Sequence, residues 1–119
     1  MKIAVSAKGK DLEAEVDPRF GRAAFIMIVD TDTLDYEALD NSANSNAFKG
    51  AGIQAAGMVA DHKAEVLLTG HCGPKAFSAL KAAGVKVANE ASGTVREAVQ
   101  AFQDGRFSYA QDADVGGHW

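Results

Sequence analysis

The sequence is poor in cysteine, with Cys72 the single residue of this type in a chain of 119. One cysteine excludes an intramolecular disulfide and a Cys-x-x-Cys redox motif, because both need a pair. It also excludes the all-cysteine sites of structural zinc and of ordinary iron–sulfur clusters. Any metal must therefore be held with little help from thiolates of this chain.

Long apolar runs and excess positive charge are also absent. No segment approaches the roughly 18 apolar residues of a membrane span, and none carries the cleavage pattern of a signal peptide. We therefore expect a cytoplasmic protein without a membrane partner. The 16 acidic residues outnumber the 12 basic ones, for a formal net charge of -4. Because nonspecific binding to nucleic acid depends on Lys and Arg, we expect no nucleic-acid partner.

The length and composition are those of one globular domain. A chain of 119 residues can bury one core and has little room for a second. With 47% hydrophobic and 24% charged residues, the composition is ordinary for a protein that folds unaided. We predict one domain over residues 1–107. Residues 108–119 are mostly polar and contain glycine, so we predict a mobile C-terminal tail there.

Hydrophobic periodicity predicts strands and helices in a particular order. Apolar or alternating runs of strand length occupy residues 2–7, 24–29, 35–40, 66–69 and 85–88. Helical spacing begins near Gly52, and again at Pro74, which is favoured at the first position of a helix. Thr94 and Glu97 form a capping box that opens a further helix, ending near Asp104.

This order of elements predicts an α/β fold. Three strands in succession indicate an antiparallel meander, and the alternating helices and strands that follow indicate βα units with right-handed crossovers. We therefore expect a five-stranded mixed sheet flanked by about three helices. The polar segment 41–46 is rich in Asn and Ser and predicts a turn.

His71 and Cys72 stand side by side where a predicted strand turns into a helix. Ligands of α/β folds bind beyond the carboxyl ends of strands, where a helix N-terminus offers N–H groups and a partial positive charge. Gly70 and Gly73 let a ligand approach the backbone closely, so the turn up to Pro74 is a candidate site with His71 and Cys72 as candidate metal ligands. In the alternative interpretation, Cys72 is a small buried hydrophobic residue and His71 is only hydrogen-bonded.

The spacing around Cys72 argues against catalysis by its thiol. A phosphatase-type loop needs an arginine six positions after the cysteine, and Ser78 stands there. A Cys-His-Asn triad would need His62 or His118 opposite the thiol, and nothing in the sequence supports it. The predicted strand 2–7 carries no acid, which argues against two-metal nuclease chemistry. Since no nucleophile–base pair can be assembled, we expect a protein that is not an enzyme.

Two arginines precede the second predicted strand. Arg19 and Arg22 flank Phe20 and Gly21, and guanidinium groups recognise anions with geometric specificity. The alternative is an ion pair between Asp17 and an arginine that only orders the loop. Both interpretations remain open from the sequence.

Residues 50–55 satisfy the loose Gly-x-Gly-x-x-Gly/Ala pattern of dinucleotide sites. The match is weak, because that fingerprint needs a strand that enters the turn directly, and the polar segment 41–48 intervenes here. A better interpretation is a helix start at Gly50, Ala51 and Gly52 whose N–H groups, with Lys49, hold an anion. The alternative is a plain flexible start of a helix.

Three segments together resemble the dinitrogenase iron-molybdenum cofactor biosynthesis family. They are Asp17-x-Arg19-Phe20-Gly21-Arg22-Ala23, Gly50-Ala51-Gly52-Ile53, and Thr69-Gly70-His71-Cys72-Gly73-Pro74 with Ala76. The resemblance spans residues 1 to about 105 and implies a ribonuclease H-like fold with sheet order 3-2-1-4-5 and no catalytic turnover. Family members bind or carry molybdenum–iron–sulfur cofactor precursors, and the chain is most similar to small members that carry a mixed molybdenum–copper sulfide cluster.

A cluster of this kind agrees with the residues. It is a bulky anion whose sulfides already satisfy its metals, so the protein need supply only positive potential, N–H donors and a shaped pocket. We therefore expect a non-catalytic carrier of an anionic molybdenum–sulfur cluster, with protein partners that deliver or receive it. The candidate cofactor-binding residues are Arg19, Arg22, Lys49, Gly50, Ala51, Gly52, Gly70, His71, Cys72, Gly73 and Pro74, with direct ligation by Cys72 or His71 left open. The alternative function is a regulatory interaction module with a vestigial pocket, read by a partner through the terminal Gly116-Gly117-His118-Trp119.

Overall fold

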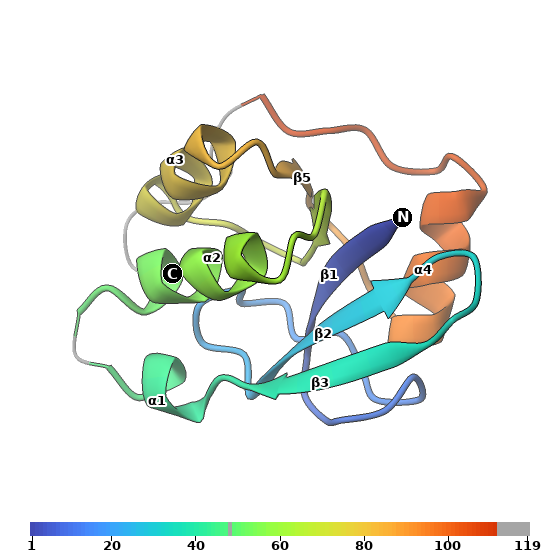
Figure 1. Ribbon diagram of the computed structural model, residues 1–119, viewed down its shortest axis with the longest axis horizontal. Coiled ribbons are helices and arrows are strands. Elements are labelled where there is room, and N and C mark those ends of the chain that lie inside the picture. Colours follow the sequence, from blue (N-terminus) through green and yellow to red (C-terminus); the bar gives the residue numbers. More distant parts are fainter. Residues whose placement is uncertain (48, 112–119) are drawn as a thin grey trace.

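A mixed β-sheet with helices on both faces is the frame of the molecule (Figure 1). The computed structural model describes residues 1–47 and 49–111. The strands are β1 (Lys2–Ala7), β2 (Phe25–Asp30), β3 (Tyr36–Asp40), β4 (Val66–Leu68) and β5 (Lys86–Ala88), in the order β3-β2-β1-β4-β5. β2 is antiparallel to β1 and β3, whereas β1, β4 and β5 are parallel. The predicted five-stranded α/β sheet of order 3-2-1-4-5 is confirmed.

The helices are α1 (Ser42–Ser45), α2 (Ala51–Asp61), α3 (Pro74–Ala82) and α4 (Val95–Gln103). Helix α4 begins with the predicted capping box, in which Thr94 Oγ1 accepts the N–H of Glu97 at 3.1 Å and Glu97 Oε1 accepts the N–H of Thr94 at 2.9 Å. Helix α3 begins at Pro74, as the sequence predicts. Across the described residues, every helix is too short or too polar to cross a membrane.

The segment after β3 differs from the prediction. The sequence predicts a turn over residues 41–46, but Ser42–Ser45 form the short helix α1. The backbone N–H of Ser42 donates to Asp40 Oδ1 at 2.8 Å, and this bond is the main cause that lowers the pKa of the Asp40 carboxyl from its usual 3.8. Ser and Asn side chains favour turns and helix ends alike, so the pattern does not separate the two outcomes.

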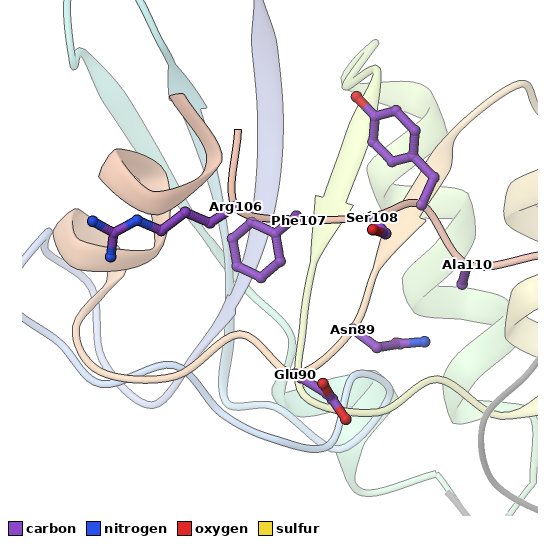
Figure 2. A pocket seen from close by; sticks show the side chains of 7 residues that line it. Asn89, Glu90, Arg106, Phe107, Ser108 and Ala110 are labelled. Carbon is purple, nitrogen blue, oxygen red and sulfur yellow. The ribbon is translucent and has the colours of Figure 1, made fainter. Parts of the chain in front are cut away.

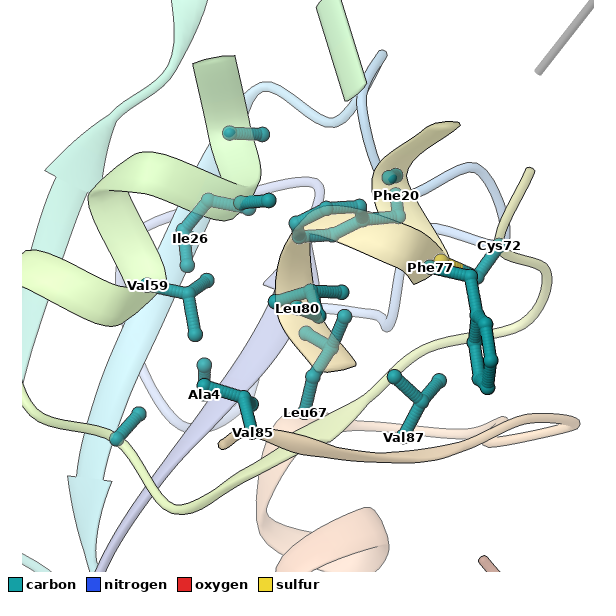
Figure 3. Packing of buried hydrophobic residues seen from close by; sticks show 14 of the residues in the cluster. Ala4, Phe20, Ile26, Val59, Leu67, Cys72, Phe77, Leu80, Val85 and Val87 are labelled. Atoms are coloured by element: carbon teal, nitrogen blue, oxygen red, sulfur yellow. The ribbon is translucent and has the colours of Figure 1, made fainter. Parts of the chain in front are cut away.

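Alternate residues of the strands face opposite sides, so the sheet has a core on each face. On one face, sheet residues such as Ala4, Ile26 and Leu67 pack against α2 and α3 (Figure 3). On the other face, Ile3 and Val5 belong to the cluster that α4 covers. Because the central strands are buried on both sides, β1 contains an apolar run over residues 3–5 and β2 one over residues 25–29.

The described end of the chain lies along β5. The N–H of Ala110 donates to the carbonyl of Val87 at 2.7 Å, and Lys86 Nζ lies 4.8 Å from the centre of the Tyr109 ring. Tyr109 and Ala110, which the sequence assigns to the tail, therefore contact the strand β5. Residues 112–119, with the terminal segment 116–119 of the alternative function, lie outside the described residues.

Candidate functional site

The segments singled out from the sequence meet at one edge of the sheet. β1, β4 and β5 run in the same direction, so the turns that follow them lie at their common carboxyl edge. β2 starts at this edge, where Phe25 pairs with Ala7, and β3 ends there, where Asp40 pairs with Phe25. In the sheet, β2 and β3 lie on one side of β1, whereas β4 and β5 lie on its other side. Ligands of open α/β sheets bind at such a reversal of strand order.

The loop 17–22 pairs with the turn that follows β4. The N–H of His71 donates to the carbonyl of Pro18 at 2.7 Å, and the N–H of Phe20 donates to the carbonyl of His71 at 3.4 Å. Arg19 and His71 thereby form a parallel bridge. A Cβ on Gly70 would lie 2.6 Å from Pro18 Cα, so this close pairing requires glycine.

The same loop rests on the start of α2. A Cβ on Gly21 would lie 2.7 Å from the backbone nitrogen of Gly52. Asn41 fixes this region from a third side, since its side chain is fully buried and Nδ2 donates to the carbonyls of Gly21 at 3.3 Å and Ala23 at 2.8 Å. The structure thus brings the three predicted segments together through the loop. The sequence marks Asn41 only as part of a polar turn.

The two arginines of the loop have different surroundings. Arg22 is half-buried, and its Nη1 donates to the carbonyls of Ser45 at 2.9 Å and Ala47 at 2.8 Å, which fixes the segment before α2. Arg19 is exposed, and its side chain makes no hydrogen bond or ion pair with the described residues. Of the two guanidinium groups, that of Arg19 is the one available to a ligand.

Asp17 orders the loop through the backbone. Its carboxylate Oδ1 accepts the N–H of Arg19 at 3.0 Å, and its side chain is buried. The described part of the chain contains no ion pair between Asp17 and an arginine. The ordering role considered for Asp17 is therefore met without using a guanidinium group.

Two helices begin beside this loop, each with a glycine at its N-cap. Gly50 caps α2 in the left-handed region, with φ of 77°, and Gly73 caps α3, so neither helix start receives a side-chain bond from its N-cap residue. Lys49 is exposed next to the first of them. α2 and α3 pack against each other, and both starts carry the partial positive charge of a helix N-terminus. The arrangement is suited to an anion.

Cys72 lies inside the core. Its side chain is fully buried in the same cluster as Phe20 and Phe77 (Figure 3), and its Sγ lies 3.7 Å from the carbonyl oxygen of Gly73. These surroundings are those of a small buried hydrophobic residue, whereas the neighbouring His71 is half-buried. Among the described residues, no three His, Cys, Asp or Glu side chains are grouped so that they could hold a metal ion. Direct ligation by Cys72 or His71 stays a prediction.

Two cavities lined by described residues were not signalled by the sequence. One, of about 470 Å³, is lined by Asn89, Glu90 and residues 106–110 (Figure 2). A second, of about 370 Å³, shares Tyr109 and Ala110 and extends over Phe77 and residues 84–87. Asn89 Oδ1, at the first cavity, is buried and has no hydrogen-bond partner among residues 1–47 and 49–111. Their walls come from segments distant in the chain, so no local motif marks them.

Comparison with known proteins identifies the family. Residues 1–105, which include the whole sheet and α4, match the family model described as dinitrogenase iron-molybdenum cofactor. The chain belongs to this family. The match covers the loop 17–22 and both helix starts, so the family resemblance predicted from these segments is confirmed.

Solved structures of similar proteins share the fold of this chain. The chain is 50% identical to the orange protein from Desulfovibrio gigas, solved in its apo form, with a TM-score of 0.93 over 96% of each chain. A Thermotoga protein named for NifB and the DUF35 family is 36% identical, with a TM-score of 0.79 over 91% of each chain. An uncharacterized protein of Methanocaldococcus jannaschii is 28% identical over 109 residues, which are 89% of this chain and 88% of the relative.

Proposed function

We propose that this chain binds and carries an anionic molybdenum–sulfur cluster, of the mixed molybdenum–copper sulfide type, at the carboxyl edge of the sheet. The observation that carries the proposal is the contact of the loop 17–22 with the start of α2 and with the turn that leads into α3. The family is named for the iron-molybdenum cofactor, and the similar orange protein was solved in an apo form, which supports a metal–sulfur ligand. The cluster is cargo that passes between partner proteins, and no catalytic turnover is involved.

The chemistry of the donors fits a preformed cluster better than a bare metal ion. The described residues offer no group of three or more ligand side chains, and the thiol of Cys72 is buried. A cluster whose metals are already bound by sulfide needs no such group. It needs hydrogen-bond donors and positive potential, which helix starts and cations supply.

The residues of the proposed site have distinct roles. Arg19 and Lys49, both exposed, offset the charge of the cluster, and the backbone around Gly50, Ala51 and Gly52 supplies N–H donors. The turn that contains Gly70, His71, Gly73 and Pro74 forms the opposite wall. Arg22 acts indirectly, because its guanidinium holds the segment that leads into α2.

A titration tests the proposal. Apoprotein is mixed with tetrathiomolybdate and copper(II), passed through a desalting column, and assayed for both metals and for a visible charge-transfer band. We expect both metals and the band to stay with the protein. Arg19→Gln should weaken retention by about fivefold, the value of one exposed charge contact, whereas Arg106→Gln, on another exposed arginine, should not. A desalted wild-type protein without metal would end the proposal.

Substitution of Cys72 tests whether its thiol is a direct ligand of the cluster. Because its thiol is buried, we expect Cys72→Ser and Cys72→Ala to retain the cluster with altered affinity. Circular dichroism establishes that each variant is folded. Complete loss of the cluster from folded variants of both kinds would instead make the thiolate a direct ligand and contradict noncovalent binding.

A further inference from the structure

Buried hydroxyl groups connect β1, β4 and the loop 17–22. Ser6 and Thr69 are fully buried at the carboxyl ends of two adjacent parallel strands. Ser6 Oγ donates to the carbonyl of Asp17 at 2.7 Å and lies 2.7 Å from Thr69 Oγ1. In return, the N–H of Asp17 donates to the carbonyl of Ser6 at 2.8 Å. The start of the loop is thereby tied to the middle of the sheet.

The direction of these bonds follows from the number of protons. A serine hydroxyl has one proton, and that of Ser6 is used on the carbonyl of Asp17. Ser6 Oγ must therefore accept from Thr69, whose hydroxyl is the donor. The bonds run from Thr69 to Ser6 to the carbonyl of Asp17, and consecutive bonds in a buried chain strengthen one another.

This hydroxyl chain ends beside the proposed site. The residue after Asp17 is Pro18, whose carbonyl accepts the N–H of His71 at 2.7 Å. Thr69 and His71 lie on either side of Gly70, which contacts Pro18 directly. The hydroxyl chain therefore sets the position at which the loop begins to pair with the turn after β4.

We infer that Ser6 and Thr69 are positioning residues of the cluster site, holding the loop so that Arg19 lies against His71. The inference rests on the proposed function, since neither buried side chain reaches a ligand at the surface. A net hydrogen bond adds little to stability, but a buried acceptor without its donor is costly. The carbonyl of Asp17 must therefore stay where Ser6 Oγ can reach it, and this selects one placement of the loop.

Three substitutions test the direction of the hydrogen bonds in the hydroxyl chain. Thr69→Ser keeps the donor, and retention of the tetrathiomolybdate–copper product should equal that of wild type. Thr69→Val removes the donor but leaves the bond from Ser6 to Asp17, and Ser6→Ala removes both bonds. We expect affinity to fall about threefold for Thr69→Val and about tenfold for Ser6→Ala, on the scale of one and two lost buried hydrogen bonds.

A stability control separates positioning from general weakening. Val99 is a buried residue of α4 and belongs to the core cluster on the other face of the sheet from Ala4 and Leu67. Val99→Ala should destabilise the protein and leave cluster affinity at the wild-type value. If Ser6→Ala and Val99→Ala reduce affinity equally at equal loss of stability, the positioning role is contradicted.

Amide hydrogen exchange tests the inference without any ligand. In apoprotein Ser6→Ala, the amides of Phe20 and His71 should exchange about tenfold faster than in wild type after correction for global stability. Thr69→Ser and Val99→Ala should leave these two amides unchanged. If the amides of Phe20 and His71 exchange at the wild-type rate in Ser6→Ala, the inference is overturned. If the wild-type protein retains no cluster, the proposed function fails, and the exchange rates still decide whether the hydroxyl chain positions the loop.

Discussion

Gly21 and Gly52 meet backbone to backbone, so that a Cβ on Gly21 would lie 2.7 Å from both the Cα and the nitrogen of Gly52. Gly52 belongs to the first turn of α2, and Gly21 belongs to the loop that also pairs with His71. The three atoms nearest to such a Cβ are all main-chain atoms, of Gly52 and Ala51, which cannot move aside as a flexible side chain can. The approach of the loop to the helix start therefore depends on the absence of a side chain at position 21.

Gly21→Ala is expected to lower the free energy of unfolding by about 1 to 3 kcal/mol, the usual cost of overpacking. The added methyl group must displace either the loop or the start of α2. Urea denaturation measures the stability loss, and the desalting assay should show weaker retention of the cluster.

Gly57→Ala, in the helix α2 that Gly21 contacts, is the matched control for Gly21→Ala. A Cβ on Gly57 would meet nothing within 4 Å, and alanine is a better helix former. This variant should gain about 0.5 to 1 kcal/mol and keep the cluster. A Gly21→Ala protein that gained stability like Gly57→Ala would contradict the close approach to Gly52.

Arg22→Gln and Arg19→Gln should differ in stability. Arg22 donates to the carbonyls of Ser45 and Ala47, so its loss should cost about 1 to 2 kcal/mol. Arg19 is exposed, and its loss should change stability by less than about 0.5 kcal/mol while weakening cluster retention. Equal unfolding midpoints for the two variants would contradict these separate roles.

The carboxyl of Asp30, the last residue of β2 before the turn to β3, should make the stability of the protein depend on pH. Its Oδ1 accepts the N–H groups of Asp32 at 2.8 Å and Thr33 at 3.3 Å. These bonds lower the pKa of the Asp30 carboxyl from its usual 3.8, and the bond from Asp32 is the larger cause. The ionised carboxylate therefore contributes stability that is fully present above pH 3.8 and is lost as the pH falls through the lowered pKa.

Asp30→Asn removes this titration. The variant should be less stable than wild type at neutral pH, and the difference should shrink as the pH falls below 3.8. Unfolding curves across that range measure the difference, and NMR titration measures the pKa directly. A difference that grows on acidification would have the wrong sign for a lowered pKa.

Local patterns were enough to predict the strands and most helix starts, whereas the order of the strands in the sheet was implied by the family resemblance. The capping box of Thr94 and the proline at position 74 act within one helical turn, and both helices begin where these signals stand. Apolar runs likewise located the strands, and in the structure the segments that follow β1, β4 and β5 share one edge of the sheet. The convergence of Arg19, Gly52 and His71 follows from that topology.

Features that depend on tertiary burial could not be predicted. Asn41 occurs in a polar run typical of an exposed turn, yet it is buried because two carbonyls of the neighbouring loop need a donor. Cys72 between glycines has the same local pattern whether it faces a ligand or the core, and only the packing of Phe20 and Phe77 distinguishes the two. The cavity at Asn89 joins two distant segments, so its lining has no sequence motif.

Mapping bound cluster by NMR tests the central claim most directly. Backbone amide shifts are recorded for apoprotein and for protein loaded with tetrathiomolybdate and copper(II). The largest changes should fall in residues 19–22, 49–53 and 70–76, with little change at residues 89–90 and 106–110. Retained cluster with its largest shifts at Asn89 and residues 106–110, and none in the loop 17–22 or the two helix starts, would contradict the proposed site.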